Sequence, residues 1–233
     1  MSDEKIAVII LAAGSSSRMG GVKKEYQKLP SGLTVLETAV RSFVPLVDII
    51  CITVSDKAEA LNALSPVFMD SLNQEVIFTG GGDSRRASAL NSLRALSPFA
   101  PRYVLIHDGA RPYVSVPLVE NIIAGVKKHD AVIPLLALTD TPKECEVSGE
   151  GQAVYIKRHL KRANVGIAQT PQAFRYPEIL HAHEKAALAE DEEFTDDAEV
   201  WSRFLGKVAA IPGEPVNRKI TFLEDLTDKR SKE

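Results

Sequence analysis

The sequence predicts an α/β fold with a doubly wound, mostly parallel sheet, and two observations support this. Continuous apolar runs without polar–apolar alternation recur along the chain, which is typical of strands covered on both faces. Between these runs lie segments whose apolar residues repeat at helical spacing. Alternation of such strands and helices favours a parallel sheet with helices packed on its two faces.

The predicted strands are the apolar runs themselves. They lie at 6–11, 49–54, 75–78, 103–106 and 131–138. The predicted helices carry the apolar stripes, and Pro117 is suitably placed for the first turn of one of them. These helices lie near 35–43, 84–96, 118–126, 178–188 and 196–205.

The alternation breaks after Leu138. The next segment contains two extended stretches around a Gly-rich turn, SGEGQ. An isolated two-stranded hairpin is only marginally stable in water. We therefore expect residues 139–165 to form a protruding β-hairpin arm, inserted in a single domain that spans 1–233. The arm is expected to pack against a second copy of the chain and so form a homodimer.

Composition narrows the function classes. The 233 residues are 45% hydrophobic and 25% charged, with a formal net charge of −3. Nothing in that balance favours nucleic acid or an anionic membrane as a partner. Cys51 and Cys145 form no CxxC pair and no disulfide framework, which suits a reducing compartment. The first apolar run is about half the ~20 residues that span a bilayer, and acidic residues precede it. A cytoplasmic location is the expectation.

The strongest signal of a binding site is the loop after the first strand, LAAGSSSRMGGVKKEY. Ligands of open α/β sheets bind beyond the carboxyl ends of the strands. Small residues expose backbone N–H groups that can surround phosphate, and Arg18 and Lys24 could neutralise its charge. The loop matches neither the dinucleotide fingerprint nor the P-loop. A flexible loop with solvated cations is the alternative, but its position favours a phosphate site.

A second signal is TGGGDSRRASAL. Three glycines at a strand end could let a flat base approach the backbone, with Asp83 and Ser88 contacting its polar edge. The alternative is a helix cap, by Asp83 or Ser84, followed by an ordinary turn.

A third signal is VLIHDGARPYV, which places Asp108 and Arg111 at the end of a buried strand. Asp108 could bind Mg²⁺, accept a hydrogen bond from a substrate hydroxyl, or form an internal ion pair with Arg111. His107 is expected to be a packing residue rather than a base. Arg162 and Lys219 matter only if the fold returns them to the first loop.

Other chemistries have weaker support. The chain contains no G-x-S-x-G elbow, which argues against a serine hydrolase. His181 and His183 are two residues apart, so a helix would place them on different faces and a zinc pair is improbable. Cys51 lies within an apolar run and is expected in the core.

Together the motifs resemble those of the 2-C-methyl-D-erythritol 4-phosphate cytidylyltransferase family. LAAGSSSRMG, GGDSRRAS, HDGARP, QTPQAF, FTDDAEVW and VNRKIT occur in that order over nearly the whole chain. A related family that uses ribitol 5-phosphate tends to carry LAGG and a DSxRP-like segment. LAAG and DGARP in this chain therefore favour methylerythritol phosphate as the acceptor.

The resemblance implies a Rossmann-like nucleotidyltransferase of the non-mevalonate isoprenoid route. It would transfer CMP from CTP to 2-C-methyl-D-erythritol 4-phosphate and release pyrophosphate, with Mg²⁺ as its metal. The alternatives are a ribitol-5-phosphate cytidylyltransferase and a non-catalytic nucleotide-binding module. A dinucleotide-dependent oxidoreductase is weakened by the missing glycine fingerprint.

The resemblance also implies three groups of site residues. Cations would hold the triphosphate and the attacking phosphate, and these are Arg18, Lys24, Arg162 and Lys219. The nucleotide would lie against Ala12, Ala13, Gly14, Gly82, Asp83 and Ser88. The acceptor would lie against Asp108, Arg111, Thr141 and Thr170, with Thr141 reaching the neighbouring subunit's substrate. Protein ligands of the metal stay unassigned.

Three positions differ from the family pattern. The usual Pro-Lys-Gln is Lys23-Lys24-Glu25 in this chain. The usual Asp-Arg pair is Lys161-Arg162, and the Leu-Trp that follows is replaced by Val165-Gly166.

Overall fold

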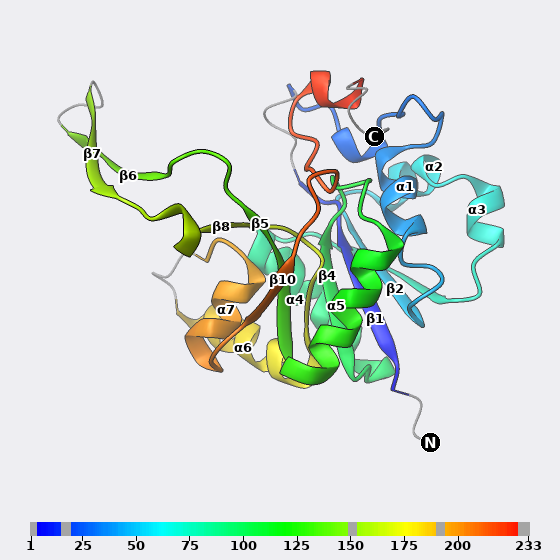
Figure 1. Ribbon diagram of the computed structural model, residues 1–233. Helices are drawn as coiled ribbons and strands as arrows, with labels where there is room; N and C mark the ends of the chain where they lie inside the picture. Colours follow the sequence, from blue (N-terminus) through cyan, green and yellow to red (C-terminus); the bar gives the residue numbers. More distant parts are fainter. Residues whose placement is uncertain (1–3, 15–19, 149–152, 190–193, 228–233) are drawn as a thin grey trace.

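A central sheet organises the computed structural model, which describes residues 4–14, 20–148, 153–189 and 194–227. The described residues form an eight-stranded sheet in the order β10-β5-β9-β4-β1-β2-β3, with β8 paired to β5 (Figure 1). Its strands are β1 (Ile6–Leu11), β2 (Ile49–Val54), β3 (Glu75–Gly80), β4 (Tyr103–Asp108), β5 (Ala131–Ala137), β8 (Gly166–Ala168), β9 (Gln172–Arg175) and β10 (Ala209–Pro212). All five strands predicted from apolar runs are confirmed.

The sheet is mostly parallel, as the apolar runs predicted. Strand β1 pairs in parallel with both β2 and β4, β2 pairs in parallel with β3, and β5 pairs in parallel with β10. Strand β9 is antiparallel to both β4 and β5, and β8 is antiparallel to β5. These antiparallel strands lie where the chain returns from the arm, and the sequence did not predict them.

Five predicted helices are confirmed, and two short ones were missed. The confirmed helices are α1 (Val35–Arg41), α4 (Arg85–Ala95), α5 (Val116–His129), α6 (Tyr176–Leu188) and α7 (Asp197–Phe204). The missed ones are α2 (Lys57–Ala63) and α3 (Pro66–Asp70). Pro117 lies in the first turn of α5, where Ser115 caps the helix by accepting a hydrogen bond from the Leu118 N–H. Within the described residues, no helix has both the length and the apolar character of a membrane span.

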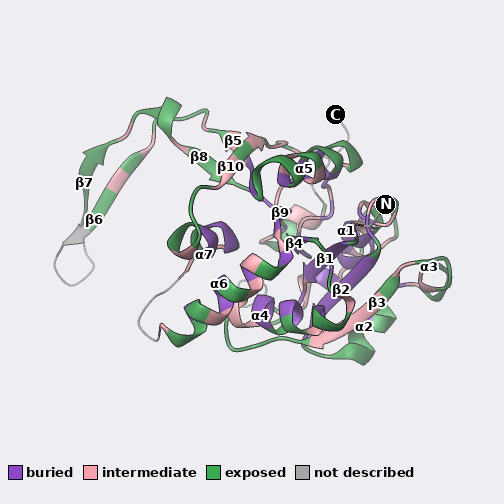
Figure 2. Cartoon of the chain, turned by 90° about the horizontal axis from the view of Figure 1, so that it is seen from below, coloured by how far each residue is buried: buried purple, intermediate pink, exposed green. Residues whose placement is uncertain are grey.

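The core has one layer on each face of the sheet, which makes the fold doubly wound (Figure 2). Along β1, Val8 and Ile10 pack with α1 and α5, whereas Ala7 and Ile9 pack with α4, α6 and α7. Alternate side chains of a strand point to opposite faces, so a strand covered on both faces must be apolar throughout. Cys51, on β2, is fully buried in the second layer, as predicted.

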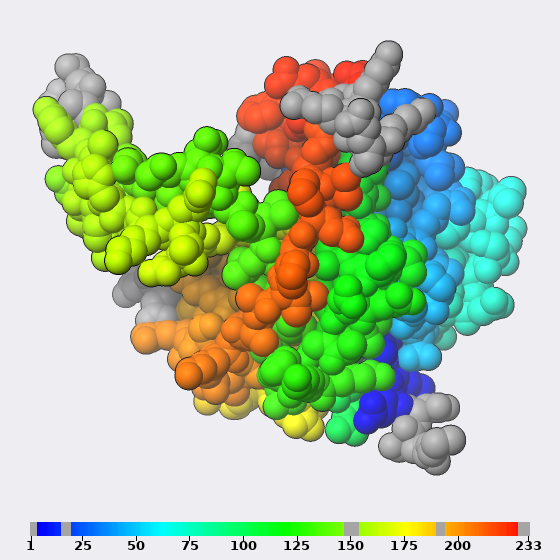
Figure 3. Space-filling model, viewed as in Figure 1, coloured from blue at the N-terminus to red at the C-terminus, as the bar shows by residue number. Residues whose placement is uncertain are grey.

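The predicted hairpin arm is present. Strands β6 (Lys143–Ser148) and β7 (Ala153–His159) pair antiparallel in a separate two-stranded sheet. Figures 1 and 3 show the arm standing out from the body of the molecule. Three apolar side chains of β7 are more than half exposed, namely Val154, Tyr155 and Ile156. Packing of this surface against a second copy stays a prediction.

Candidate active site

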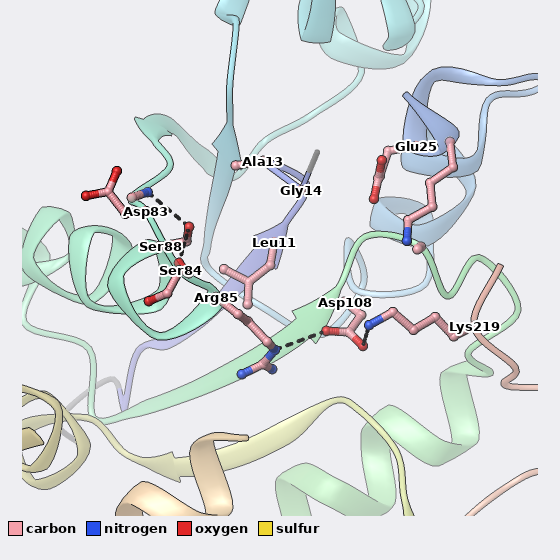
Figure 4. A pocket seen from close by; sticks show the side chains of 13 residues that line it. Leu11, Ala13, Gly14, Glu25, Asp83, Ser84, Arg85, Ser88, Asp108 and Lys219 are labelled. Atoms are coloured by element: carbon pink, nitrogen blue, oxygen red, sulfur yellow. Dashed lines mark hydrogen bonds and ion pairs between the residues drawn. The ribbon is translucent and has the colours of Figure 1, made fainter. Parts of the chain in front are cut away.

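A pocket of about 410 Å³ opens beyond the carboxyl ends of β1, β3 and β4 (Figure 4). This is the edge of the sheet where the sequence placed the binding site. Segments far apart in the chain line it, from the end of β1 to the segment before the C-terminal 3₁₀ helix η5 (Leu223–Leu226). Its lining residues are Leu11, Ala13, Gly14, Lys24, Glu25, Gly82, Asp83, Ser84, Arg85, Ser88, Asp108, Ala110 and Lys219.

One side of the pocket is the glycine-rich turn between β3 and α4. A Cβ at Gly81 would lie 2.5 Å from the Ala13 Cβ, and one at Gly82 would lie 2.6 Å from the Ala87 Cβ. Because real Cβ atoms do not approach so closely, this turn needs glycine at both positions. The Ser88 hydroxyl accepts a hydrogen bond from the Gly82 N–H at 3.0 Å and holds the turn in place.

The helix cap expected in this motif is also present. The Ser84 hydroxyl accepts from the Ala87 N–H at 3.0 Å at the start of α4. Ser84 is therefore the cap, and Asp83 stays exposed at the mouth of the pocket. The cap and the pocket use neighbouring residues, so the two interpretations of this motif are compatible.

The opposite side of the pocket is the 3₁₀ helix η2 (Lys24–Tyr26), which supplies Lys24 and Glu25. Glu25 is only 3% exposed. Burial raises the pKa of its carboxyl group, although a hydrogen bond from its own backbone N–H and the charges of Lys24, Lys23 and Lys219 act in the opposite direction. Lys23 itself donates to the Gly14 carbonyl at 2.9 Å and so ties η2 to the end of the first strand–loop segment.

Asp108 lies at the floor of the pocket, at the end of β4, and is surrounded by cations. Its carboxylate lies 3.0 Å from the Lys219 Nζ, 3.4 Å from the Arg111 Nε and 3.5 Å from the Arg85 Nε. Burial would raise the pKa of Asp108, but these three cations hold it well below its usual range. The predicted ion pair with Arg111 is confirmed, and Asp108 also orients Lys219 in the pocket.

A buried hydrogen-bond network holds the backbone of Asp108 in place. The Thr170 hydroxyl accepts from the Asp108 N–H at 3.1 Å, and the same hydroxyl lies 3.0 Å from the His107 Nδ1. Burial lowers the pKa of His107 to about 4. The neutral ring can donate from Nε2 to the Arg111 carbonyl at 3.0 Å and accept from Thr170. His107 is thus a packing and hydrogen-bonding residue, as predicted.

The C-terminal segment reaches the pocket through the same network. The Asn217 side chain donates to the Thr170 carbonyl at 2.8 Å, and the Asn217 carbonyl accepts from the Arg111 guanidinium at 2.8 Å. Two residues further along the chain, the Lys219 ammonium group contacts the Asp108 carboxylate. The fold therefore does return Lys219 to the first loop.

Comparison with known proteins agrees with this geometry. The family model for 2-C-methyl-D-erythritol 4-phosphate cytidylyltransferase matches residues 6–230. The chain belongs to this family. The resemblance noted from the sequence motifs is thereby confirmed.

Curated and solved relatives of this cytidylyltransferase family give the same result. The bifunctional enzyme IspD/IspF of Brucella anthropi is 36% identical over 233 residues, which cover 97% of this chain and 55% of the relative. That of Bartonella henselae is 37% identical over 224 residues, covering 95% of this chain and 55% of the relative. The chain thus spans about half the length of the curated relatives it matches.

Two crystal structures of the family have nearly the same extent as this chain. The 4-diphosphocytidyl-2C-methyl-D-erythritol synthase of Anaerococcus prevotii is 30% identical, with a TM-score of 0.80, and the match covers 96% of this chain and 93% of that one. The 2-C-methyl-D-erythritol 4-phosphate cytidylyltransferase of Thermus thermophilus is 29% identical, with a TM-score of 0.74 and 95% coverage of both chains.

Most residues that the family pattern implied lie at the pocket. Those that line it are Ala13, Gly14, Lys24, Gly82, Asp83, Ser88, Asp108 and Lys219. Ala12 is fully buried beside it, and Arg111 and Thr170 contact Asp108. Their roles toward ligands stay predictions.

Two implied residues lie elsewhere, and the structure does not describe a third. Thr141 and Arg162 belong to the arm region, and neither lines the pocket of its own chain. The Arg162 guanidinium donates to the Thr139 carbonyl at the base of the arm. Arg18 lies outside the described residues.

Sequence reasoning missed Arg85, which links the pocket to the helices on one face. Its guanidinium contacts Asp108 and lies 2.8 Å from the Asp197 carboxylate, whose other oxygen lies 3.2 Å from the His183 Nε2. Arg85 follows the Ser84 cap directly. Its place in the first turn of a helix that follows a strand end is the sequence signal that could have indicated a role in the pocket.

Three carboxylates lie in the pocket, on Glu25, Asp83 and Asp108. Over the described ranges, no group of three or more His, Cys, Asp or Glu side chains has the arrangement of a metal cage. Mg²⁺ typically takes one or two carboxylates together with substrate phosphates and water. One or two of the three pocket carboxylates would be enough for such a cation.

Proposed function

We propose that this chain transfers CMP from CTP to 2-C-methyl-D-erythritol 4-phosphate, giving 4-diphosphocytidyl-2-C-methyl-D-erythritol and pyrophosphate. The observation that carries the proposal is the convergence of Lys24 and Lys219, nearly two hundred residues apart, on one pocket. A site for a single anion would not need cations from both ends of the chain. Family membership, and the names of the two solved relatives, support the choice of CTP and methylerythritol phosphate.

The proposed reaction is an in-line displacement. A phosphate oxygen of the acceptor attacks the α-phosphorus of CTP, and the bond from that phosphorus to the bridging oxygen breaks. Pyrophosphate leaves with the electron pair. The nucleophile is already ionised at neutral pH, so no strong base is needed. The main barrier is to bring two polyanions together, and lysines fixed in advance lower it.

Lys219 is suited to that role because Asp108 fixes it before any ligand binds. The 3.0 Å contact between them holds the ammonium group at the pocket floor. Asp108 also forms ion pairs with Arg85 and Arg111. Three cations therefore surround one carboxylate, and the net charge around it is positive. In the proposed role, Lys219 holds the acceptor phosphate and Lys24 holds the triphosphate.

The turn between β3 and α4 is proposed to bind the nucleoside. Gly81 and Gly82 pack this turn closely against Ala13 and Ala87, and a flat base is proposed to lie against the backbone so formed. Asp83 and the Ser88 hydroxyl stand at the same wall and offer polar groups to cytosine.

Three finer points belong to the same proposal. A homodimer would bring Thr141 and Arg162 of one arm to the substrate of the other subunit. Mg²⁺ would accompany the triphosphate, with phosphate oxygens and water as its main ligands, and would neutralise part of its charge. The expected compartment is the cytoplasm.

An assay of pyrophosphate release tests the proposal. CTP and Mg²⁺ are supplied with methylerythritol phosphate in one series and with ribitol 5-phosphate in a parallel series. Release that requires methylerythritol phosphate is the expected result. Saturable CTP binding without release with either acceptor would indicate a non-catalytic module and contradict the proposal. Release with ribitol 5-phosphate alone would contradict the choice of acceptor.

A further inference from the structure

Glu25 places a buried carboxyl group in a pocket that must accept polyphosphate. It is 3% exposed, and Figure 4 shows its carboxyl group facing the pocket, on the side away from Asp83. Its Oε2 atom is fully buried and has no hydrogen-bond partner among the described residues. A buried polar atom without a partner costs about 1–3 kcal/mol, so such an atom normally has a function.

The charges around Glu25 are mixed. Burial opposes its ionised form and raises its pKa, although a hydrogen bond from its own backbone N–H and the charges of Lys24, Lys23 and Lys219 act in the opposite direction. On the same 3₁₀ helix, Tyr26 is a neutral neighbour whose own pKa is raised to about 12, chiefly by burial. The nearest charges are therefore the lysines that a polyphosphate would engage.

Helices α1 and α2 pack against this segment, and their charged groups have other partners. On α1, Glu37 binds Arg41 and the Ser65 N–H. On α2, Lys57 lies over the Phe78 ring, and Glu59 acts on Tyr26. Neither helix supplies a further cation that would keep Glu25 ionised.

We propose that Glu25 binds the triphosphate as a neutral carboxyl group, whose O–H donates a hydrogen bond to a phosphate oxygen. The inference rests on the proposed function, because CTP supplies the phosphate. An ionised carboxylate aimed at a polyanion would repel it, whereas a protonated carboxyl group is uncharged and supplies an O–H donor on the pocket wall. Binding therefore takes up a proton at Glu25, since the ligand adds negative charge and engages the neighbouring lysines.

A glutamine at this position would be an uncharged isostere of the proposed neutral form. An amide donates the same hydrogen bond at every pH. Glutamate at position 25 therefore makes the affinity for triphosphate depend on pH, whereas glutamine would keep the shape of the pocket without that dependence.

Calorimetry of CTP binding tests the inference. Titrations of the wild type, Glu25→Gln and Glu59→Gln are run between pH 6.5 and 8.5, in buffers of different ionisation enthalpy. The ligand's own protonation is common to all three proteins. We expect the wild type and Glu59→Gln to take up more protons than Glu25→Gln. Their affinity relative to Glu25→Gln should fall as pH rises, by up to about tenfold per pH unit.

A second variant separates hydrogen bonding from repulsion. Glu25→Met carries neither charge nor donor, so it should show no extra proton uptake and should bind CTP about tenfold more weakly than Glu25→Gln. Equal proton uptake by the wild type and by whichever non-titrating variant folds would overturn the inference. Absence of CTP binding in the wild type would refute the proposed function itself, and the inference with it.

Discussion

Asp108 shows how a single buried carboxylate arranges the cations of the pocket. It contacts Lys219, Arg111 and Arg85, which come from three different segments of the chain. Its pKa lies well below the usual range because of these cations, so it stays ionised at any physiological pH. The lysine is therefore held in position before a ligand arrives, and binding loses less side-chain entropy.

Replacement of Lys219 tests this arrangement. We expect Lys219→Ala to reduce kcat/KM for pyrophosphate release by about 10²–10³-fold, by analogy with a lost oxyanion donor. The fold should persist, because 42% of the side chain is exposed. Steady-state kinetics, with circular dichroism as the check on folding, measure both. Lys128→Ala, on the exposed face of α5, is the matched control and should keep full activity.

At the residue scale, the site could be predicted only where a motif carries its own backbone signal. Gly82, Asp83 and Ser88 stand at a glycine-rich strand end, and Asp108 ends an apolar run. Arg85 could not be separated from Arg86 by sequence, since which of them enters the pocket depends on the helix that follows the cap. Nothing in the sequence indicated that Glu25 is buried, because its burial depends on the packing of η2.

At the scale of elements, α6 and α7 are joined to the pocket by one buried acid. Asp197, in the first turn of α7, is fully buried between Arg85 of α4 and His183 of α6. Burial would raise its pKa, but Arg85 and His183 lower it to about 2. These two contacts of Asp197 connect the helices on one face of the sheet to Arg85, which in turn contacts Asp108.

We expect Asp197→Asn to lower the free energy of unfolding by about 3–5 kcal/mol, the usual cost of removing one partner from a buried ion pair. Urea denaturation measures it. The comparison is Glu184→Gln, which breaks the exposed pair of Glu184 and Arg94 and should cost less than about 1 kcal/mol. Similar losses in the two variants would show that the buried pair has no special role in stability.

The long elements were predictable because their apolar patterns are long. Strands β1 to β5 and helices α1, α4 and α5 each carry a run or stripe that few other structures would produce. Strand β8 has three residues, all exposed, and β10 has four that are only partly covered, so neither gives such a pattern. Helices α2 and α3 depend on the caps Asp56 and Ser65 more than on apolar periodicity.

At the scale of the whole molecule, stability depends on pH through buried groups. Burial lowers the pKa of His107 from 6.5 to about 4, so the unfolded chain binds a proton before the folded one does. Its contribution is complete above about pH 6.5 and is lost as pH falls toward 4, by on the order of 3 kcal/mol. Asp197 continues the loss below pH 4, where its carboxylate is protonated first in the unfolded chain.

Urea midpoints measured from pH 7.5 down to pH 4 should therefore fall steadily. The variant His107→Gln removes the titrating ring and should flatten that part of the profile, even if its stability at pH 7.5 is lower. An unchanged slope in His107→Gln would show that other groups cause the acid sensitivity.

The assembly of two chains is the remaining prediction at this scale, and the arm is its basis. Val154, Tyr155 and Ile156 are 67%, 57% and 55% exposed, on a hairpin whose two strands, within the described residues, pair only with each other. Two strands alone are marginally stable, and burial of such side chains would contribute roughly 1.5–3 kcal/mol each. A second copy would cover them.

We expect the wild type to be a dimer by light scattering at micromolar concentration, and Ile156→Asp to be a monomer, because a charge on β7 would oppose burial of that surface. Val67→Asp, on the 81% exposed Val67 of α3, should remain a dimer. If Thr141 and Arg162 act across the interface, the monomer should still bind CTP through its own Lys24 and Lys219 but lose pyrophosphate release. A fully active monomer would show that each pocket works alone and that the arm serves another purpose.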